Sequence, residues 1–313
     1  MTDHKPNNPM QLDLSDHFIT CIKRWYGKTG EKWLANLPDH IAACAAEWDL
    51  EIGAAMPNLS ANYVTNVRLP NGEEAILKLS PHKKPFMEME ALEQLKSRPG
   101  IVNLLHSSEE LAAMVIEKII PGTPLTKVQK KDDEEAIRIA APIIRDVQAN
   151  VPQKHHLRTV SKEMEVIKKV RGMDIEDKET VDMLDKALSI LKELESTTLE
   201  LKLIHGDLHH DNILIDDEKG WLAIDPKGMI GDPAYNAARI MRNYWDSEPT
   251  ESMVRTRIEI LSEVMGHEQK RIAAWAYLDC VLSESWDLDE IGKRGEDEKP
   301  IIMLIESVLD SYS

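Results

Sequence analysis

The sequence predicts an α+β protein in which a smaller, β-rich part precedes a larger, mostly helical part. The first part is indicated by residues 50–80 and 101–117, where short apolar runs alternate with turn residues. From about residue 125 onward, apolar residues recur mainly at helical spacing. The exception is the stretch 203–232, LIHGDLHHDNILIDDEKGWLAIDPKGMIGD, in which strands return around a polar loop.

Helices and strands of the first part follow from caps, turns and apolar spacing. Ser15 can cap a first helix that buries Phe18 and Trp25 on its apolar face. Pro38 opens a second helix, and Pro85 starts a third. The strands expected between the second and third helices are Asn62–Leu69 and Glu74–Leu79, joined by a proline–asparagine–glycine turn.

A hinge between the two parts is expected around residues 118–124. The sequence PGTPL at Pro121–Leu125 breaks the regular pattern there. We therefore expect an N-terminal lobe at residues 1–120, with a helical extension at its start, and a C-terminal lobe at residues 121–313. The helices expected in the second lobe begin at Asp132, Ser161, Asp177 and Asp232, and residues 250–312 are helical as well.

The composition describes a globular protein and limits its partners. The 313 residues are 42% hydrophobic and 30% charged, with a net charge of −17. Such a field repels nucleic acid and anionic membranes and attracts small cations, although an acidic surface also serves solubility alone. No apolar run approaches the ~20 residues that span a bilayer, the N-terminus is polar, and three cysteines are widely spaced. We expect a cytoplasmic protein that binds neither nucleic acid nor membrane.

Three side chains with oxygen ligands are expected to converge in residues 203–232. Two apolar runs flank the polar loop, and a turn leads to a third run that stops at Asp225. This pattern of strand, loop, strand, turn and strand projects Asp207, Asn212 and Asp225 from strand ends into one place. Two carboxylates and a carboxamide suit a hard cation such as Mg²⁺ with a phosphate attached.

The histidines of the same loop raise the alternative of a zinc site. His205 and His209 are four residues apart, and His210 is adjacent. Zinc would need that spacing on a helix, whereas Gly206 and the surrounding strand pattern place these residues in a loop. We therefore expect His205 to support the loop by hydrogen bonds, and His209 and His210 to pack or to face solvent.

The order of Asp207, Asn212 and Asp225 matches the needs of phosphoryl transfer from ATP. That reaction requires a carboxylate for the acceptor hydroxyl, ligands for Mg²⁺ and a cation for the α/β-phosphates. The three residues supply one base and two metal ligands, in the order in which protein kinases present them.

The cation can come from Lys78, which lies within the expected strand Glu74–Leu79. The two-residue period of a strand puts Lys78 on the same face as Ile76, which weakens the interpretation of a purely solvated lysine. An acidic helix follows. Glu90 is expected to pair with Lys78, and Glu88 or Glu93 could take its place.

The motifs HGDLHHDN at 205–212 and IDPKG at 224–228 resemble the aminoglycoside phosphotransferase superfamily, and within it the streptomycin 6-kinase and hydroxyurea phosphotransferase branch. The resemblance covers roughly residues 31–290. It implies a bilobal, protein-kinase-like fold with a small β-rich N-lobe, extra N-terminal helices and a larger, mostly helical C-lobe. Supporting similarities occur at Trp33-Leu34, Leu37-Pro38, Trp48, 75–79 (AILKL), 121–123 (PGT), 231–235 (GDPAY), Arg242-Asn243 and 282–286 (LSESW).

The resemblance also implies a role for each candidate site residue. Asp207 would be the catalytic base, and Asn212 and Asp225 would bind Mg²⁺. Lys78 would contact the phosphates of ATP, with Glu90 as its anchor. Backbone groups would hold adenine at Glu117, Lys118, Ile119 and Ile120, and the loop Met56–Asn62 would cover the phosphates.

Two positions depart from the family pattern. The phosphate loop has no glycine, so hydroxyl and amide side chains such as Ser60 and Asn62 would replace the close backbone approach. Asp211 stands where this branch often has a small residue, and the sequence assigns it no role.

The acceptor contacts implied by the resemblance lie near the C-terminus, at Glu284, Trp286 and Asp287. An aromatic face with carboxylates suits a cationic guanidino or amino sugar. The alternative is that Trp286 is simply a core residue.

The sequence therefore predicts a small-molecule phosphotransferase that uses ATP and Mg²⁺ and inactivates an aminoglycoside antibiotic, with streptomycin as the first candidate acceptor. Two alternatives remain open: a kinase of the same fold that acts on a metabolite such as an amino alcohol or a sugar, and a nucleotide-binding regulatory module. GTP in place of ATP, the phosphorylated hydroxyl and the oligomeric state are not determined by these motifs.

Overall fold

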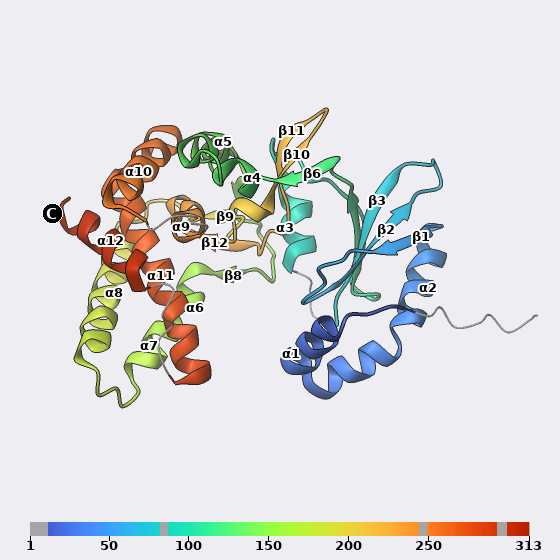
Figure 1. The fold of residues 1–313 in the computed structure, drawn as a ribbon, viewed down its shortest axis with the longest axis horizontal. Helices are drawn as coiled ribbons and strands as arrows, with labels where there is room; N and C mark the ends of the chain where they lie inside the picture. Colours follow the sequence, from blue (N-terminus) through green and yellow to red (C-terminus); the bar gives the residue numbers. More distant parts are fainter. Residues whose placement is uncertain (1–11, 82–86, 244–248, 293–298, 313) are drawn as a thin grey trace, which may run out of the picture. The chain divides into compact units, whose positions relative to one another are not determined.

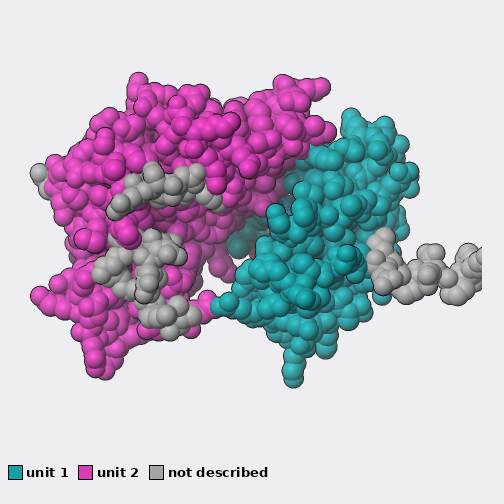
Figure 2. Space-filling view, in the orientation of Figure 1, with its two compact units in different colours: residues 1–89, 103–118 teal, residues 90–102, 119–313 magenta. Residues whose placement is uncertain are grey.

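The chain folds into two compact units, seen in a computed structural model that describes residues 12–81, 87–243, 249–292 and 299–312 (Figure 1). Unit 1 comprises residues 1–89 and 103–118, and unit 2 comprises residues 90–102 and 119–313, as coloured in Figure 2. The chain therefore passes from one unit to the other three times. The hinge predicted at residues 118–124 corresponds to the third passage only. The passages after residues 89 and 102 were not predicted.

Unit 1 is built on an antiparallel sheet of five strands in the order β1-β2-β3-β5-β4. The predicted strands at 62–69 and 74–79 are confirmed as β2 and β3. Burial alternates along β2, as in a half-buried strand, whereas the last three residues of β3 are all buried. The elements of this unit are α1 (Asp16–Ala35), α2 (Leu37–Trp48), β1 (Glu51–Ala55), β2 (Tyr63–Arg68), β3 (Glu74–Leu79), β4 (Leu104–Ser108) and β5 (Ala113–Glu117).

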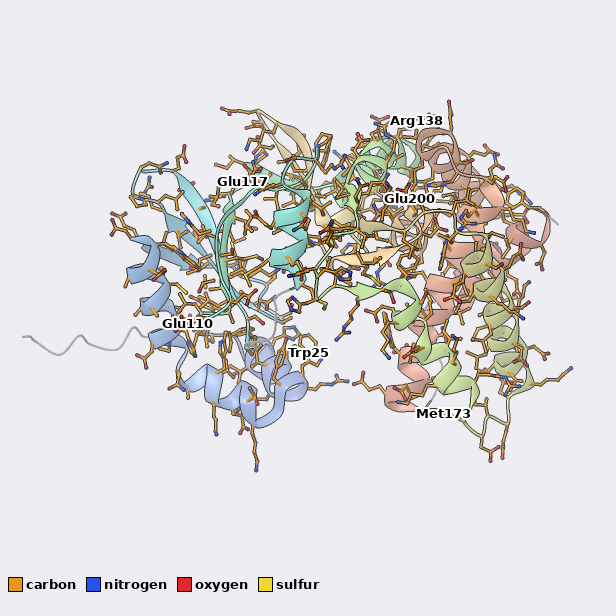
Figure 3. The ribbon with its side chains drawn as sticks, turned by 180° about the vertical axis from the view of Figure 1, so that it is seen from behind. Trp25, Glu110, Glu117, Arg138, Met173 and Glu200 are labelled. Carbon is orange, nitrogen blue, oxygen red and sulfur yellow. The ribbon has the colours of Figure 1, made fainter. Side chains whose placement is uncertain are left out.

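The core of unit 1 joins the two N-terminal helices to the sheet. Ser15 caps α1 by accepting a hydrogen bond from the backbone N–H of Phe18 (3.2 Å), and Phe18 is fully buried, as predicted. Trp25, labelled in Figure 3, was expected to be buried but is 52% exposed. Since Gly27 interrupts the helical backbone two residues later, the helical spacing does not extend through Trp25 to the next turn.

Helix α3 (Met87–Leu95) is divided between the units, since the boundary falls between Met89 and Glu90. The expected helix start at Pro85 lies outside the described residues.

Unit 2 contains two small sheets, ordered β11-β10-β6 and β7-β9-β12-β8, among helices. The segment expected as a break at 121–125 contributes the short strand β6, which pairs with β10. The strands are β6 (Pro121–Pro124), β7 (Gln148–Asn150), β8 (Arg158–Thr159), β9 (Lys202–Ile204), β10 (Ile213–Asp216), β11 (Gly220–Ala223) and β12 (Met229–Gly231). The helices are α4 (Thr126–Gln129), α5 (Asp133–Asp146), α6 (Val160–Glu163), α7 (Glu165–Arg171), α8 (Lys178–Thr197), α9 (Ala238–Arg242), α10 (Glu251–Met265), α11 (Gln269–Ile291) and α12 (Lys299–Asp310).

The predicted order of strand, loop, strand, turn and strand in residues 203–232 is confirmed as β9, a loop, β10, a turn and β11. The loop carries one turn of 3-10 helix, η1 (His210–Asn212). Helix α11 is buried without interruption from Ile272 to Leu282. It therefore supplies the packing surface on which α9 and the elements around the loop are held.

No helix in the described part of the chain is both long enough and apolar enough to cross a bilayer.

Candidate active site

The loop that carries Asp207 is held from inside by His205. The His205 ring is fully buried, and its Nδ1 accepts a hydrogen bond from the backbone N–H of Asp207 (3.2 Å). The proton of the neutral ring therefore sits on Nε2, which donates to the carbonyl oxygen of Ile224 (2.8 Å). Burial lowers the pKa of His205 to about 4 and keeps the ring neutral. The predicted supporting role of His205 is confirmed.

Gly206 lets the loop turn against β12. Its φ of +78° lies in the left-handed region, and a Cβ at this position would come within 2.7 Å of the Met229 sulfur. Its N–H donates to Oδ1 of Asn236 (3.2 Å), and the amide nitrogen of that buried asparagine donates to the carbonyl of Ile144 (2.8 Å). Glycine is therefore required here by both backbone conformation and space.

The carboxylate of Asp207 faces two cations that the sequence interpretation did not identify. Arg239 on α9 donates its Nε–H to Oδ1 of Asp207 at 2.7 Å, and the Nζ of Lys227 lies 3.8 Å from the same oxygen. Burial opposes ionisation of Asp207, but Lys227 and Arg239 outweigh it and lower its pKa. Asp207 is therefore a carboxylate at neutral pH, the form that a general base needs.

The two predicted metal ligands, Asn212 and Asp225, are held by the backbone around the loop. Asn212 donates its side-chain N–H to the carbonyl oxygen of Asp207 (3.0 Å), which orients its amide. The backbone carbonyl of Asn212 accepts a hydrogen bond from the N–H of Ile224 (2.9 Å), the residue before Asp225. Asp225 adopts a φ of +58°, a left-handed conformation that is uncommon outside glycine and that Asp tolerates better than most residues. An amide oxygen and a carboxylate suit Mg²⁺, so these residues fit the expected ion.

The other loop residues tie the loop to its surroundings. Asp211 accepts a hydrogen bond from the hydroxyl of Thr126 at the start of α4, which gives this carboxylate a structural role. His210 is buried, as expected for a packing residue, and burial lowers its pKa to about 3. Burial also lowers the pKa of His209. Among the described residues, no three His, Cys, Asp or Glu side chains are grouped so that they could hold a metal ion.

In unit 1, Lys78 is anchored by Glu88 and not by Glu90. The Nζ of Lys78 lies 2.8 Å and 2.7 Å from the two carboxylate oxygens of Glu88, and both side chains are largely buried. Glu90 instead accepts the backbone N–H of His156 with both oxygens (3.1 and 3.0 Å). The expected pairing was wrong because residues two apart on a helix project in nearly opposite directions, so α3 can offer only one of them to β3.

The expected phosphate loop connects β1 to β2. Leu59 is buried in the core of unit 1 and anchors this loop. Ser60 beside it is exposed, and Asn62 is half-buried where β2 begins. The exposed hydroxyl and the amide therefore lie on a loop that is fixed at its centre.

The expected adenine segment spans the boundary between the units. Glu117, labelled in Figure 3, ends β5, and its backbone N–H donates to the carbonyl of Asn103 (3.0 Å). The N–H of Ile120 donates to Oδ2 of Asp216 (3.1 Å). Since both N–H groups are used within the protein, Lys118 and Ile119 carry the remaining backbone N–H groups of this segment that could meet a base.

The candidate acceptor residues lie on α11. The ring of Trp286 has the Nζ of Lys227 at 5.7 Å and the guanidinium carbon of Arg239 at 6.0 Å from its centroid, so it contacts both partners of Asp207. Glu284 is almost completely buried, and Asp287 is half-buried. The structure thus brings Trp286 to the surroundings of Asp207, although protein cations already lie over its ring.

A family model described as aminoglycoside/hydroxyurea antibiotic resistance kinase matches residues 47–292 of the chain. The chain belongs to this family.

Curated relatives match over nearly the whole length of this kinase family member. It is 26% identical over 293 residues to a streptomycin 6-kinase of Streptomyces glaucescens, with 89% of the chain and 92% of the relative covered. It is 27% identical over 293 residues to the streptomycin 6-kinase of Streptomyces griseus, with the same coverage. It is 25% identical to a hydroxyurea phosphotransferase of Kitasatospora aureofaciens, covering 89% of the chain and 81% of the relative. The chain is accordingly a small-molecule phosphotransferase with a hydroxyl group as acceptor.

Solved structures confirm the predicted protein-kinase-like fold of this kinase. A choline kinase LicA from Streptococcus pneumoniae aligns with a TM-score of 0.63 at 18% identity, covering 88% of the chain and 100% of that structure. The amicoumacin kinase hAmiN, in complex with AMP-PNP, Ca²⁺ and Ami, aligns with a TM-score of 0.61 at 13% identity, covering 90% and 96%. At these identities the likeness concerns the fold alone.

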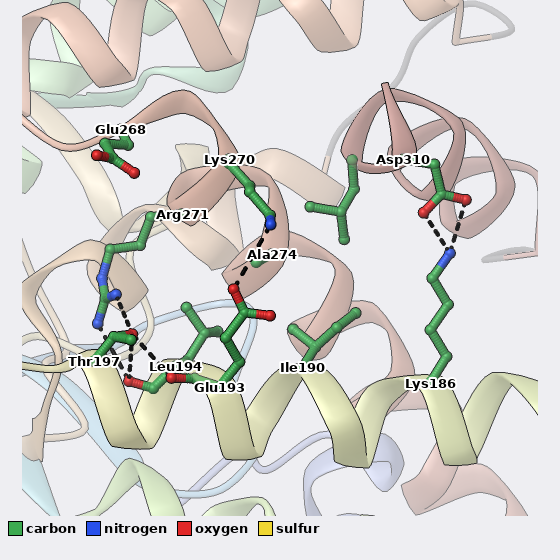
Figure 4. A pocket seen from close by; sticks show the side chains of 11 residues that line it. Lys186, Ile190, Glu193, Leu194, Thr197, Glu268, Lys270, Arg271, Ala274 and Asp310 are labelled. Atoms are coloured by element: carbon green, nitrogen blue, oxygen red, sulfur yellow. Dashed lines mark hydrogen bonds and ion pairs between the residues drawn. The ribbon is translucent and has the colours of Figure 1, made fainter. Parts of the chain in front are cut away.

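A separate pocket of about 270 Å³ in the helical part of the kinase contains none of the loop residues (Figure 4). Its walls come from α8, α11 and α12 and carry charges of both signs. Lys186 binds Asp310 (2.7 Å), and Lys270 lies 3.6 Å from Glu193. These cations already face anions, so we assign no ligand to this pocket.

Proposed function

We propose that the chain transfers the γ-phosphate of ATP, with Mg²⁺, to a hydroxyl group of an aminoglycoside, with streptomycin as the first candidate. The observation that carries this proposal is the loop of unit 2. It presents an ionised Asp207 and an Asn212 whose amide is oriented by the backbone carbonyl of Asp207, and Asp225 follows β11 in a left-handed conformation. A half-buried carboxylate with a lowered pKa can orient an acceptor hydroxyl and take its proton.

The donor side of the proposal rests on unit 1. Lys78 is positioned by Glu88 and would bind the α/β-phosphates of ATP. The loop with Ser60 and Asn62 would cover the phosphates, and backbone groups of residues 117–120 would receive the adenine, with Lys118 and Ile119 as the remaining N–H donors. When bound at Asn212 and Asp225, Mg²⁺ would neutralise negative charge on the phosphate oxygens.

Three observations support a cationic acceptor. The net charge of the chain is −17, which attracts cations over long range. On α11 the half-buried carboxylate of Asp287 follows Trp286 at the candidate acceptor positions, whereas Glu284 is buried. Two of the relatives that align over most of their length bear the name streptomycin 6-kinase.

An acceptor screen tests this proposal. ADP formation is followed with MgATP and, in turn, streptomycin, hydroxyurea and choline, and the product is examined for an added phosphoryl group by mass spectrometry. We expect ADP formation to be stimulated by streptomycin and the product to be streptomycin phosphate. Stimulation by hydroxyurea or choline without any by streptomycin would overturn the acceptor assignment.

The assignment of Asp207 is tested in the same assay. The variant Asp207→Ala should lose most of the rate, because no other described carboxylate holds this place on the loop. Retention of the rate would make the base assignment wrong while leaving the choice of acceptor intact.

A further inference from the structure

Asp207 lies at one end of a row of ion-paired side chains whose charges alternate in sign. Its Oδ1 accepts the Nε–H of Arg239 at 2.7 Å, and the Nη1 of Arg239 lies 3.5 Å from Oδ2 of Asp279 on α11. Asp279 accepts the hydroxyl of Tyr235 on its Oδ1 (2.9 Å) and the Nε–H of Arg242 on its Oδ2 (2.5 Å). The order is therefore carboxylate, guanidinium, carboxylate, guanidinium.

Burial makes each member of this row depend on the next. The side chain of Asp279 is only 2% exposed and that of Arg239 only 13% exposed. A buried ion is tolerated when partners replace its water, and leaving one ion without its partner is costly. The guanidinium of Arg239 therefore contacts Asp279 through Nη1 and Asp207 through Nε, and Asp279 holds it in position.

Arg239 is not needed to hold α9 against α11. Arg242, on the same helix, already ties α9 to α11 through Asp279 and through the hydroxyl of Ser283 (3.2 Å). The Nε–H of Arg239 is directed instead to the carboxylate of the loop. This contact connects the functional carboxylate with the helical core.

Both cations approach the same oxygen of Asp207. Arg239 donates to Oδ1, and the Nζ of Lys227 lies 3.8 Å from Oδ1 as well. Two cations on one oxygen distinguish the two otherwise equivalent oxygens of the carboxylate. Oδ2 is then the oxygen that an acceptor hydroxyl can meet in a defined direction.

We infer that Arg239 is a positioning residue that holds Oδ1 of Asp207 so that Oδ2 receives the proton of the acceptor hydroxyl, and that Asp279 keeps Arg239 in that position. This inference rests on the proposed role of Asp207 as the base. It assigns to Arg239 no contact with the substrate.

The consequence is a loss of orientation when the guanidinium is removed. Without Arg239 the carboxylate can turn about its Cβ–Cγ bond, and a displacement of about 1 Å at the reacting group can cost about 100-fold in rate. A lysine in place of Arg239 keeps the charge but lacks the planar fork that reaches two carboxylates at once.

Four variants of the full-length protein test the inference with MgATP and streptomycin. We expect Arg239→Met to lower kcat about 100-fold, and Asp279→Asn to lower it about 10-fold, with KM for both substrates changed less than about 3-fold. Arg239→Lys should recover part of the loss. Lys186→Met, which removes an ion pair from the pocket of Figure 4, is the control and should leave kcat unchanged.

A crystal structure of Arg239→Met provides a second measurement that does not depend on turnover. We expect the carboxylate of Asp207 to be turned or to occupy more than one orientation, while the loop backbone stays in place. An unchanged carboxylate orientation, or an increase in KM with kcat intact, would overturn the inference.

The two measurements also separate this inference from the proposed function. If the unaltered protein does not phosphorylate streptomycin, the acceptor proposal fails, and the crystallographic result still decides whether Arg239 positions Asp207. If the unaltered protein is active and Arg239→Met keeps its kcat, the positioning role fails and the proposed function stands.

Discussion

The candidate site residues of each unit include a largely buried ion pair with an atom separation of 2.7 Å, and the two pairs are used in opposite ways. In unit 1, Lys78 is held between both oxygens of Glu88, so one anion supports one cation. In unit 2, Arg239 is shared between Asp207 and Asp279, so one cation supports two anions. In unit 1 the residue with the proposed function is the cation, Lys78. In unit 2 it is the anion, Asp207.

The two pairs differ in how they leave the functional residue able to bind a ligand. Lys78 has three ammonium protons, so it can contact phosphate and Glu88 at the same time. Asp207 has two oxygens, and Arg239 occupies one of them, which leaves the other for a hydroxyl group. In both units the supporting residue defines a direction as well as supplying a charge.

The largest effect is expected from Asp207→Asn, which removes the charge of the unit 2 pair and keeps its shape. We expect kcat to fall by about 10²–10⁴-fold with little change in KM for ATP, because proton transfer is lost while the residues proposed to bind ATP are unchanged. Steady-state ADP formation measures both constants. Asp211→Asn is the matched control, since this neighbouring carboxylate binds Thr126, and an equal loss in the control would contradict the difference in role.

Neutralising Asp225, one of the two proposed Mg²⁺ ligands, should have the next largest effect. Asp225→Asn keeps an oxygen ligand and a residue that tolerates the left-handed backbone, so the charge is tested alone. We expect the Mg²⁺ concentration for half-maximal rate to rise by about 10-fold or more, because a neutral amide binds a divalent cation less tightly. Titration of Mg²⁺ at constant ATP measures this value. Asp217→Asn, on the exposed turn after β10, should leave it unchanged.

A change in the ion pair of unit 1 should have a smaller effect, and it should alter KM for ATP more than kcat. Glu88→Gln should raise KM for ATP about 10-fold, because a charge-assisted hydrogen bond that positions Lys78 is weakened. Glu90→Gln is the control on the same helix and should leave KM for ATP unchanged, since Glu90 binds a backbone N–H of His156. A higher KM in Glu90→Gln with none in Glu88→Gln would reverse the assignment.

The smallest effect concerns the stability of the loop in unit 2. His205 has a pKa of about 4 in the folded protein against an ordinary value of 6.5, so the folded state binds the proton less well than the unfolded state. Its contribution to stability is therefore complete above pH 6.5 and is lost as the pH falls from 6.5 to 4. The free energy of unfolding should decrease over this range by up to about 1.4 kcal/mol per pH unit for this group.

Urea unfolding at several pH values between 4 and 7 measures this dependence. A His205→Gln variant should show a shallower decrease than the unaltered protein, whereas His156→Gln, at an exposed histidine, should show the same decrease. An equal slope in all three proteins would assign the acid sensitivity to other groups, such as the buried His210.

The local parts of this site could be predicted from the sequence. The strand Glu74–Leu79 and the strands around the loop follow from short apolar patterns and turn residues, because these depend on neighbours in the chain. The supporting role of His205 could be predicted for the same reason, since both of its hydrogen bonds lie within the motif region.

The supporting partners could not be predicted, because they depend on helix phase and on distant packing. To choose between Glu88 and Glu90, one must know which face of α3 is turned toward Lys78, to within about one residue. The spacing of the acidic residues does not give this orientation. Arg239 lies 32 residues after Asp207, and no local pattern links the two. The available signal was a charged residue inside the apolar run at 237–241, since a buried arginine requires an anion nearby.

The three passages of the chain between the units limit how the gene could be divided. Residues 90–102 belong to unit 2, and there the N–H of Val102 donates to the carbonyl of Ala223 while Gly100 accepts from the N–H of Ala223. A fragment that ends at residue 118 would carry these strand-like partners without Ala223, and a fragment that starts at residue 119 would lack them. Split-protein reporters and domain exchanges with other kinases should therefore transfer residues 90–102 together with the C-terminal part.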